Sequence, residues 1–332
     1  VLGRVMGIRA LPGFPYSYEQ SSGGYLALGV IALWLTRKHL RRVGTMLLSA
    51  RGEPEAAEYR VAAAAVALGF AGLVLFGMYL GMGAWVAAAF FGLFYVIQIA
   101  IGRMRAEIGT PLHDLHFGGP STILVNALGS ARLSHTSLIG LTQMWSIDRA
   151  YRSNAVPHQL EGLKLAERVN AQRRGFIIAL LVGSALSGVF AFWAMLHQSY
   201  EVGIDNAAPV NRWFGYEAWA RFQRWTSQRV GTDVPAISFS LVGFVATLAL
   251  MVARTRFVWW PFHPLGYAIS GSWQMTWGWG SFFIIWAVKL VILKHSGIQG
   301  FRRATAYFLG LLMGDVFVGG TWTMVGIGFR LW

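Results

Sequence analysis

The chain of 332 residues contains no cysteine, which excludes disulfides, thiolate metal sites and cysteine nucleophiles. Acidic residues are also scarce, since 14 Asp and Glu stand against 28 Lys and Arg. No Walker A motif, G-x-S-x-G elbow or H-E-x-x-H motif is present, so the sequence gives no support to ATP-driven or hydrolytic chemistry. We therefore expect no enzyme and no bound cofactor, although scattered residues could still assemble an intramembrane active site.

The chain is rich in apolar residues. Hydrophobic residues make up 55% of it, charged residues 13%, and the mean hydropathy is +0.49. Forty glycines and fifteen tryptophans suit close helix contacts in lipid and anchoring at the membrane interface. The formal net charge of +14 comes from basic residues that lie mainly in short loops between apolar runs. This position indicates that they set the membrane topology and contact anionic lipid headgroups, and do not bind nucleic acid. The composition predicts an all-α polytopic membrane protein.

The apolar runs predict roughly six full transmembrane helices plus one or two broken or re-entrant segments. They form a single membrane-embedded domain over residues 1–332. The positive-inside rule places the basic loops on the cytoplasmic face, at residues 37–60, 147–174 and 294–303. Residues 198–235 are then external, and their repeated aromatic and arginine residues predict a helix that lies on the membrane or packs over the protein. Residues 158–174 predict an amphipathic cytoplasmic helix.

Residues 120–146 are long enough to cross a membrane once, yet basic loops precede and follow them. An even number of passes reconciles hydropathy with charge, so this segment is predicted to turn near Gly129 instead of forming one continuous helix. Asn126, Arg132 and His135 lie in it. Their side chains either line a substrate cavity, together with freed backbone groups, or form the polar face of an ordinary packed helix.

Residues 101–120 end an apolar helix and place six ionisable groups before a Gly-Gly-Pro interruption. Such groups are costly at membrane depth, so they must lie at the interface, in a polar cavity or in pairs. Arg105 and Glu107 either form an ion pair, or Glu107 binds a coupling proton or a substrate amine. His113 and His116 are weak metal candidates, and as loop histidines they are expected to be solvated.

A second irregular segment is predicted at residues 257–279, which are aromatic and interrupted by two prolines. His263 lies between those prolines and is expected to cap or break a helix, and Gln274 is a polar candidate for the path. Asp315 stands in the middle of the last apolar run, where a carboxylate has no route to the interface. We expect it to face protein or an aqueous cavity.

Several stretches resemble a family of uncharacterised bacterial multi-pass membrane proteins that is grouped, by distant similarity, with the oligopeptide transporters. The resemblance covers nearly the whole chain. The stretches that carry it are EAAEYR at 55–60, RMRAEIGTPLHDLHFGGP at 103–120, LEGLKLAERVN at 160–170, WWPFHPLGYAIS at 259–270 and FFIIWAVKLVILKHSG at 282–297. It implies a transporter-like fold in the bacterial cytoplasmic membrane. It also implies a further amino-terminal half, so the chain resembles the carboxy-terminal half of a longer protein.

Two functional hypotheses follow. The first is a secondary transporter that moves a small polar solute, peptide-like or a metal chelate, through broken helices. Its candidate path residues are Arg105, Glu107, Asn126, Arg132, His135, His263, Gln274 and Asp315. The second is a non-transporting structural or accessory subunit of a larger membrane complex. The expected partners are the lipid bilayer and either the missing half, a second copy or other membrane subunits.

Overall fold

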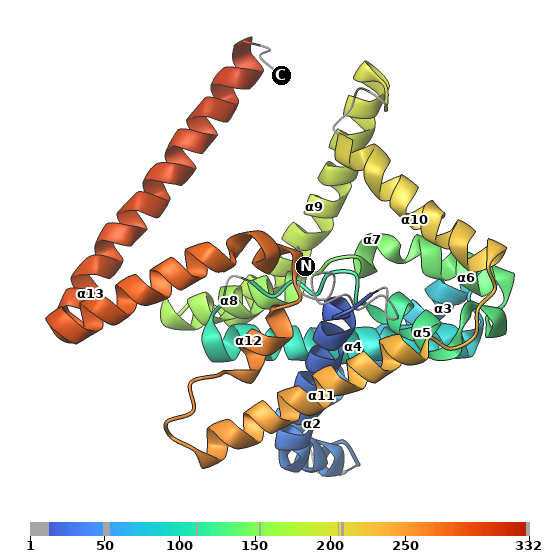
Figure 1. Cartoon of the computed structure of the whole chain (residues 1–332), viewed down its shortest axis with the longest axis horizontal. Coiled ribbons are helices and arrows are strands. Elements are labelled where there is room, and N and C mark those ends of the chain that lie inside the picture. Colours follow the sequence, from blue (N-terminus) through green and yellow to red (C-terminus); the bar gives the residue numbers. More distant parts are fainter. Residues whose placement is uncertain are drawn as a thin grey trace. The chain divides into compact units, whose positions relative to one another are not determined.

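The computed structural model describes residues 13–48, 54–110, 112–152, 154–204, 206 and 209–329. Within these ranges all regular structure is helical (Figure 1). The long helices are α2 (Ser17–Leu48), α3 (Pro54–Tyr79), α4 (Ala84–Ile108), α9 (Arg173–Val202), α10 (Pro209–Ser227), α11 (Val234–Arg256) and α13 (Trp273–Phe329). The shorter ones are α5 (Pro120–Leu128), the 3-10 turn η1 (Ser130–Arg132), α6 (His135–Gln143), α7 (Trp145–Asp148), α8 (Ala155–Arg168) and α12 (Pro264–Ile269).

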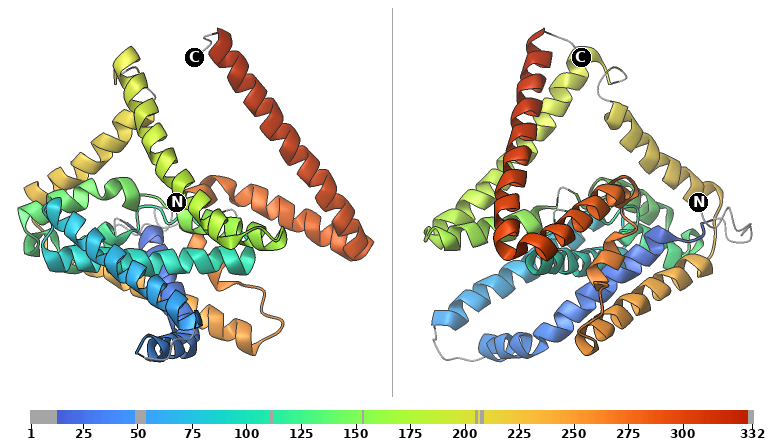
Figure 2. Two further views of the ribbon diagram at one scale, coloured as in Figure 1. Left: turned by 180° about the vertical axis from the view of Figure 1, so that it is seen from behind. Right: turned by 60° about the vertical axis from the view of Figure 1, so that its left-hand side comes forward.

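Helices α2 and α11 lie side by side and form the most extensive helix contact in the structure (Figure 2). Glycine makes their close approach possible, because a Cβ atom on Gly23 would collide with the main-chain oxygen of Ser240. A Cβ atom on Gly243 would likewise collide with the main-chain oxygen of Gln20. Helix α12 also joins α2, since the Ser21 hydroxyl donates a hydrogen bond to the Ala268 carbonyl, 247 residues further along the chain.

The prediction that residues 120–146 do not form one continuous helix is confirmed. Helix α5 ends at Gly129, whose φ of 79° takes the backbone out of the helical region. After η1 the chain starts again at Ser134, which caps α6 by accepting a hydrogen bond from the Ser137 N–H. A third short helix, α7, follows at once. Helices α5 and α6, with the turn η1 between them, therefore replace one span, and they bring polar residues to the interior.

Among the described residues, five helices are long and apolar enough to cross a membrane. They are α3, α4, α9, α11 and α13, so the protein is built as a membrane-embedded helical protein. The prediction of about six full spans remains a prediction, because α2 combines an apolar half with a basic half. The apolar window of α9 has none of its residues buried within the structure, as expected for a helix that faces lipid or another chain.

Of three further segments, two differ from the sequence prediction and one agrees with it. The amphipathic helix at 158–174 is α8, and it ends at Arg168 because Asn170 adopts a left-handed backbone (φ 51°). The aromatic segment at 257–279 is broken as predicted, into a loop, α12 and the start of α13. The basic stretch around residue 300 is helical instead of a loop, since α13 bends at Gly297 (φ 59°, ψ −158°) and continues.

The chain divides into two compact units, Val1–Met275 and Thr276–Trp332. In the first unit, one hydrophobic cluster centres on Tyr25, Leu28, Ile101 and Leu115. A second cluster packs α3 and α4 against the broken segment through Phe90, Phe91, Leu138 and Leu141. The broken segment is thus held by a packed core, and the candidate site described below lies beside it.

Candidate functional site

The turn that connects α4 to α5 places Phe117 next to α7. The Phe117 N–H donates a hydrogen bond to the Arg149 carbonyl oxygen, with an N to O distance of 2.9 Å. Phe117 adopts a φ of 57°, in the left-handed region that bulky side chains seldom occupy. Its ring stacks on Trp145 with a centroid distance of 5.7 Å and an interplanar angle of 10°. Contacts with neighbouring groups therefore hold a backbone conformation that Phe117 does not prefer.

Asp148, at the end of α7, is completely buried. Its Oδ2 accepts a hydrogen bond from the Ser121 N–H at 2.9 Å, in the first turn of α5. The residue that precedes α5, Gly119, has no side chain with which to cap the helix, so Asp148 supplies the cap from another part of the chain. A Cβ atom on Gly119 would occupy the space of the Asp148 carboxyl and of its main-chain oxygen. Gly119 and Asp148 consequently fit only as a pair.

Burial raises the pKa of Asp148 from 3.8 to about 6, and the Ser121 hydrogen bonds, the Arg221 charge and the Tyr151 hydroxyl oppose this rise. Removal of water destabilises the carboxylate more than these partners stabilise it, so the net effect is a raised pKa. The carboxyl thus changes its charge close to neutral pH. A buried acid with such a pKa is a functional candidate on physical grounds, although Asp148 lines neither of the cavities described below.

Arg221 projects from α10 against the same region. Its guanidinium lies 3.5 Å above the Trp145 ring and 4.7 Å from the Trp225 ring, and Nη2 donates to Thr122 Oγ1 at 3.0 Å. Burial lowers the pKa of Arg221 to about 10, so the group remains charged at neutral pH. Helix α10 therefore fixes a buried positive charge between two indole rings.

A second arginine joins α10 to the end of α7. Arg149 is buried and forms an ion pair with Glu217, in which Nε donates to Oε2. Its guanidinium also lies 4.5 Å from the centre of the Phe214 ring and 5.0 Å from that of Phe117. Because the planar guanidinium can stack and donate at the same time, Arg149 fills both roles, as lysine could not.

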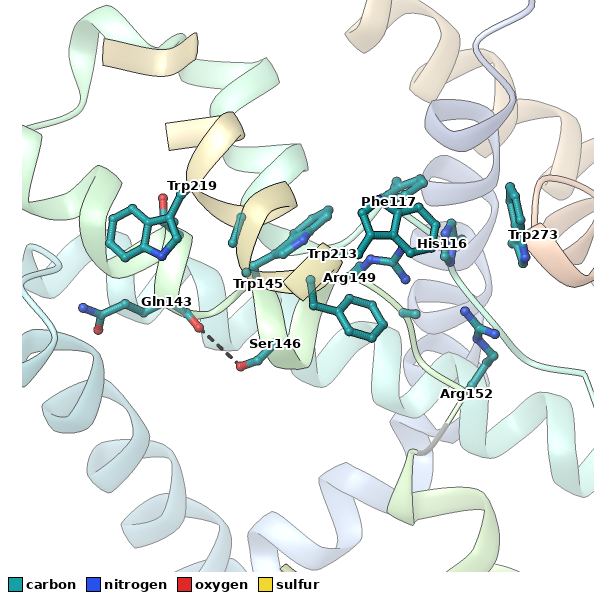
Figure 3. A pocket seen from close by; sticks show the side chains of 15 residues that line it. His116, Phe117, Gln143, Trp145, Ser146, Arg149, Arg152, Trp213, Trp219 and Trp273 are labelled. Atoms are coloured by element: carbon teal, nitrogen blue, oxygen red, sulfur yellow. Dashed lines mark hydrogen bonds between the residues drawn. The ribbon is translucent and has the colours of Figure 1, made fainter. Parts of the chain in front are cut away.

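Phe117, Arg149 and Arg221 border two cavities. The aromatic cavity, of about 950 Å³, is lined by the rings of Phe117, Trp145, Trp213, Phe214, Trp219 and Trp273 and by His116, Arg149 and Arg152 (Figure 3). None of the described residues that line it carries a carboxylate. The polar cavity, of about 530 Å³, is lined by Tyr18, Glu19, Thr122, Asn126, Glu217, Arg221, Arg224, Trp225 and Gln228, and again by Phe117 and Trp145.

The prediction of an Arg105–Glu107 ion pair is wrong. Residues two positions apart on a helix do not face each other. Arg105 donates instead to Glu161 of α8, with an Nε to Oε1 distance of 2.7 Å. Glu107 pairs with Arg103, four positions earlier, at 3.1 Å. Arg105 therefore ties α4 to α8, whereas the Glu107 pair with Arg103 lies within α4, and neither side chain lines the aromatic or the polar cavity.

The expectation of solvated loop histidines is also wrong. His113 and His116 are 4% and 2% exposed, because Leu115 between them anchors the turn in the first hydrophobic cluster. Burial lowers the pKa of His113, and the charges of Arg105 and His158 lower it further. His116 lines the aromatic cavity and lies against Trp273 at 5.9 Å between ring centres. Across the ranges that the structure describes, no group of three or more His, Asp or Glu residues could hold a metal ion.

The other predicted path residues are dispersed. Asn126 lines the polar cavity, whereas Arg132, in η1, and His135, at the start of α6, are exposed. His263 caps α12 by accepting from the Leu265 N–H, which confirms the prediction of a cap. Gln274 lies next to Trp273 without lining either cavity, and Asp315 is an exposed residue of the second unit. That Asp315 faces protein or water in a membrane stays a prediction.

Sequence reasoning missed the residues that make the site. Asp148, Arg149 and Arg152 stood in a segment whose charges were counted only toward topology, and Arg221 belonged to a helix assigned to the membrane surface. One signal was available, because aromatic residues and arginines recur together along α10. That pattern fitted two interpretations, and packing over the protein is the one that the contact between α10 and α6 bears out.

A comparison with family models matches residues 1–331 to one family, described as a family of unknown function (DUF6785). Neither a search of curated proteins nor a search of solved structures finds a match.

Proposed function

Since the chain belongs to this family of unknown function, we propose from its own residues that it is a secondary-transporter-like membrane protein that moves a small organic anion. The observation that carries the proposal is the aromatic cavity. It combines two arginines and a histidine with six aromatic rings, inside a helical membrane protein whose local helix is broken.

Charge and shape together favour an anion with a flat or apolar body. Arg149 already has a carboxylate partner in Glu217, but the Arg152 side chain is 43% exposed and lies 3.4 Å from the buried Asp114 Oδ2. Arg152 therefore has N–H donors available for a solute oxygen. Indole and phenyl rings provide large contact surfaces for a ring or a short aliphatic chain. Peptide-like carboxylates and anionic metal chelates both have this character.

The break between α5 and α6 supports transport more than passive binding. Irregular backbone at membrane depth is tolerated where it is buried in protein or lines a cavity, and transporters use it to form solute sites. Here the broken segment supplies Thr122 and Asn126 to the polar cavity and leads directly into α7 beside the aromatic cavity. The N-terminus of α5 is already capped by Asp148, so arginine side chains remain as the anion ligands.

Benzenesulfonate is a suitable first probe, because it is a permanently charged aromatic anion that crosses lipid poorly. We expect the purified protein to bind it in preference to benzyltrimethylammonium, a cation of similar size. The Arg152→Gln variant should bind it about 10-fold to 100-fold more weakly, since a hydrogen bond to a charged group contributes about 1.5–3 kcal/mol. Arg168→Gln, an exposed arginine of α8, is the control and should bind normally. Equal affinity for both probes would contradict the proposal.

Flux separates the two functional hypotheses. Liposomes that contain the protein should take up labelled benzenesulfonate faster than empty liposomes, and Arg152→Gln should remove most of the difference. Binding without flux would instead favour a non-transporting accessory subunit. The observation that favours this second candidate is α9, whose apolar stretch has no residue buried within the structure and is therefore a surface for another subunit.

A further inference from the structure

The two cavities meet at one pair of rings. Phe117 and Trp145 are the residues that line both the aromatic and the polar cavity, one from the α4–α5 turn and one from α7. Their parallel stacking makes them a wall with a different set of ligands on each side. The aromatic cavity offers Arg149 and Arg152, while the polar cavity offers Arg221 and Arg224.

The two rings are held in different ways. Trp145 belongs to a helix, is 3% exposed, is stacked under the Arg221 guanidinium and points Nε1 toward Glu217 Oε2 at 3.4 Å. Phe117 sits in a turn with a left-handed backbone and touches Tyr18 and His116 edge-on, at 5.4 and 4.0 Å between ring centres. Trp145 is therefore fixed. The Phe117 ring is held by stacking and edge contacts that a competing ring can replace, whereas its N–H is bound to the Arg149 carbonyl oxygen and its backbone has a conformation that phenylalanine does not prefer.

We propose that Phe117 is a gate that closes on Trp145 and that opens when a solute in the aromatic cavity takes its place in the stack. A planar solute held by Arg152 offers Trp145 the same stacking that Phe117 gives it. Displacing Phe117 would join the two cavities and put the solute anion within reach of Arg221 and Arg224. This inference rests on the proposed function, because it assumes that an aromatic anion occupies the aromatic cavity.

The natural absence of cysteine makes the test direct. In the variant Phe117→Cys/Trp145→Cys, dibromobimane becomes fluorescent only when it bridges the two thiols. We expect bridging in the protein alone, and slower bridging when benzenesulfonate saturates the cavity and separates the two positions. Both rings are replaced in this variant, so its binding and its flux are compared before and after bridging, and we expect bridging to remove its flux into liposomes. A matched control is Phe70→Cys/Tyr95→Cys, a ring pair between α3 and α4 with centres 5.6 Å apart. Benzenesulfonate should not change the bridging rate of this variant, and bridging should not change its flux of benzenesulfonate.

Two results would overturn the gate. One is a bridging rate that benzenesulfonate leaves unchanged although it binds, and the other is full flux through the bridged protein. If instead benzenesulfonate fails to bind the unmodified protein, the proposed function itself is at fault, so the two failures are distinguishable.

A single substitution provides a second test if the double variant does not fold. Phe117→Ala keeps Trp145, Arg149 and Arg152 and removes only the ring that closes the wall. We expect the flux of the bulkier naphthalene-1-sulfonate to rise at least about threefold relative to that of benzenesulfonate. An unchanged ratio between the two fluxes would show that Phe117 does not limit passage.

Discussion

Gly119→Ala should destabilise the protein by on the order of 3 kcal/mol or more, enough to reduce the yield of folded protein in detergent. The added methyl group would overlap the Asp148 carboxyl and its main-chain oxygen, and the main-chain atom cannot move away without shifting α7. Displacing the carboxyl also removes the cap from α5 and moves a buried acid away from Ser121. Thermal unfolding followed by fluorescence is the measurement.

Gly92→Ala is the matched control for this substitution. Gly92 lies within α4, and nothing stands within 4 Å of the position where its Cβ would be. Alanine is favoured over glycine in a helix by up to about 1 kcal/mol, so this variant should be unchanged or slightly more stable. Equal melting temperatures for the two variants would mean that the Gly119–Asp148 contact does not constrain the fold.

The second large effect concerns pH. The pKa of Asp148 rises from 3.8 to about 6 on folding because the carboxyl is buried, so the folded state holds its proton more tightly than the unfolded state. The stability that this proton contributes is fully present below pH 3.8 and is lost as pH rises through 6. A shift of this size corresponds to about 3 kcal/mol in all, of which about half is still present at pH 5 and almost none at pH 8. We expect the protein to melt at a clearly lower temperature at pH 8 than at pH 5.

Asp148→Asn should remove most of that pH dependence. Asparagine has the same shape, can still accept the Ser121 N–H bond and carries no titrating proton. Glu167→Gln, at a carboxylate of α8 whose side chain is 70% exposed, is the control and should follow the unmodified protein. Parallel melting curves for Asp148→Asn and the unmodified protein between pH 5 and 8 would show that Asp148 is not the titrating group.

Much of the architecture follows from local sequence. Apolar runs and glycine positions predicted the helical class, the long helices and the interruption at Gly129, because each depends on neighbours a few residues away. Caps were predictable for the same reason, as His263 illustrates. Local rules also argued against one prediction made here, since the spacing of Arg105 and Glu107 does not suit an ion pair within a helix.

The site depends on contacts that no local rule supplies. Asp148 is buried because Gly119, earlier in the chain, leaves space for it and because Arg221, much later, approaches from α10. Arg149 and Glu217, 68 positions apart, had no shared signature in the sequence. Basic residues in a membrane protein are first counted as topology signals, and only the packing of α10 on α6 and α7 distinguishes a loop charge from a cavity ligand.

The contact between α2 and the later helices has a consequence for biosynthesis. A protein leaves the ribosome from its amino end, so α2 is made long before α11 and α12 exist. Its glycine face and the Ser21 hydroxyl, whose acceptor Ala268 is 247 residues away, must wait for partners that are made much later. Until then this face of α2 lacks its partners, although α3 and α4 already contact the helix, and chains truncated before α11 should be degraded more rapidly than chains truncated after α12.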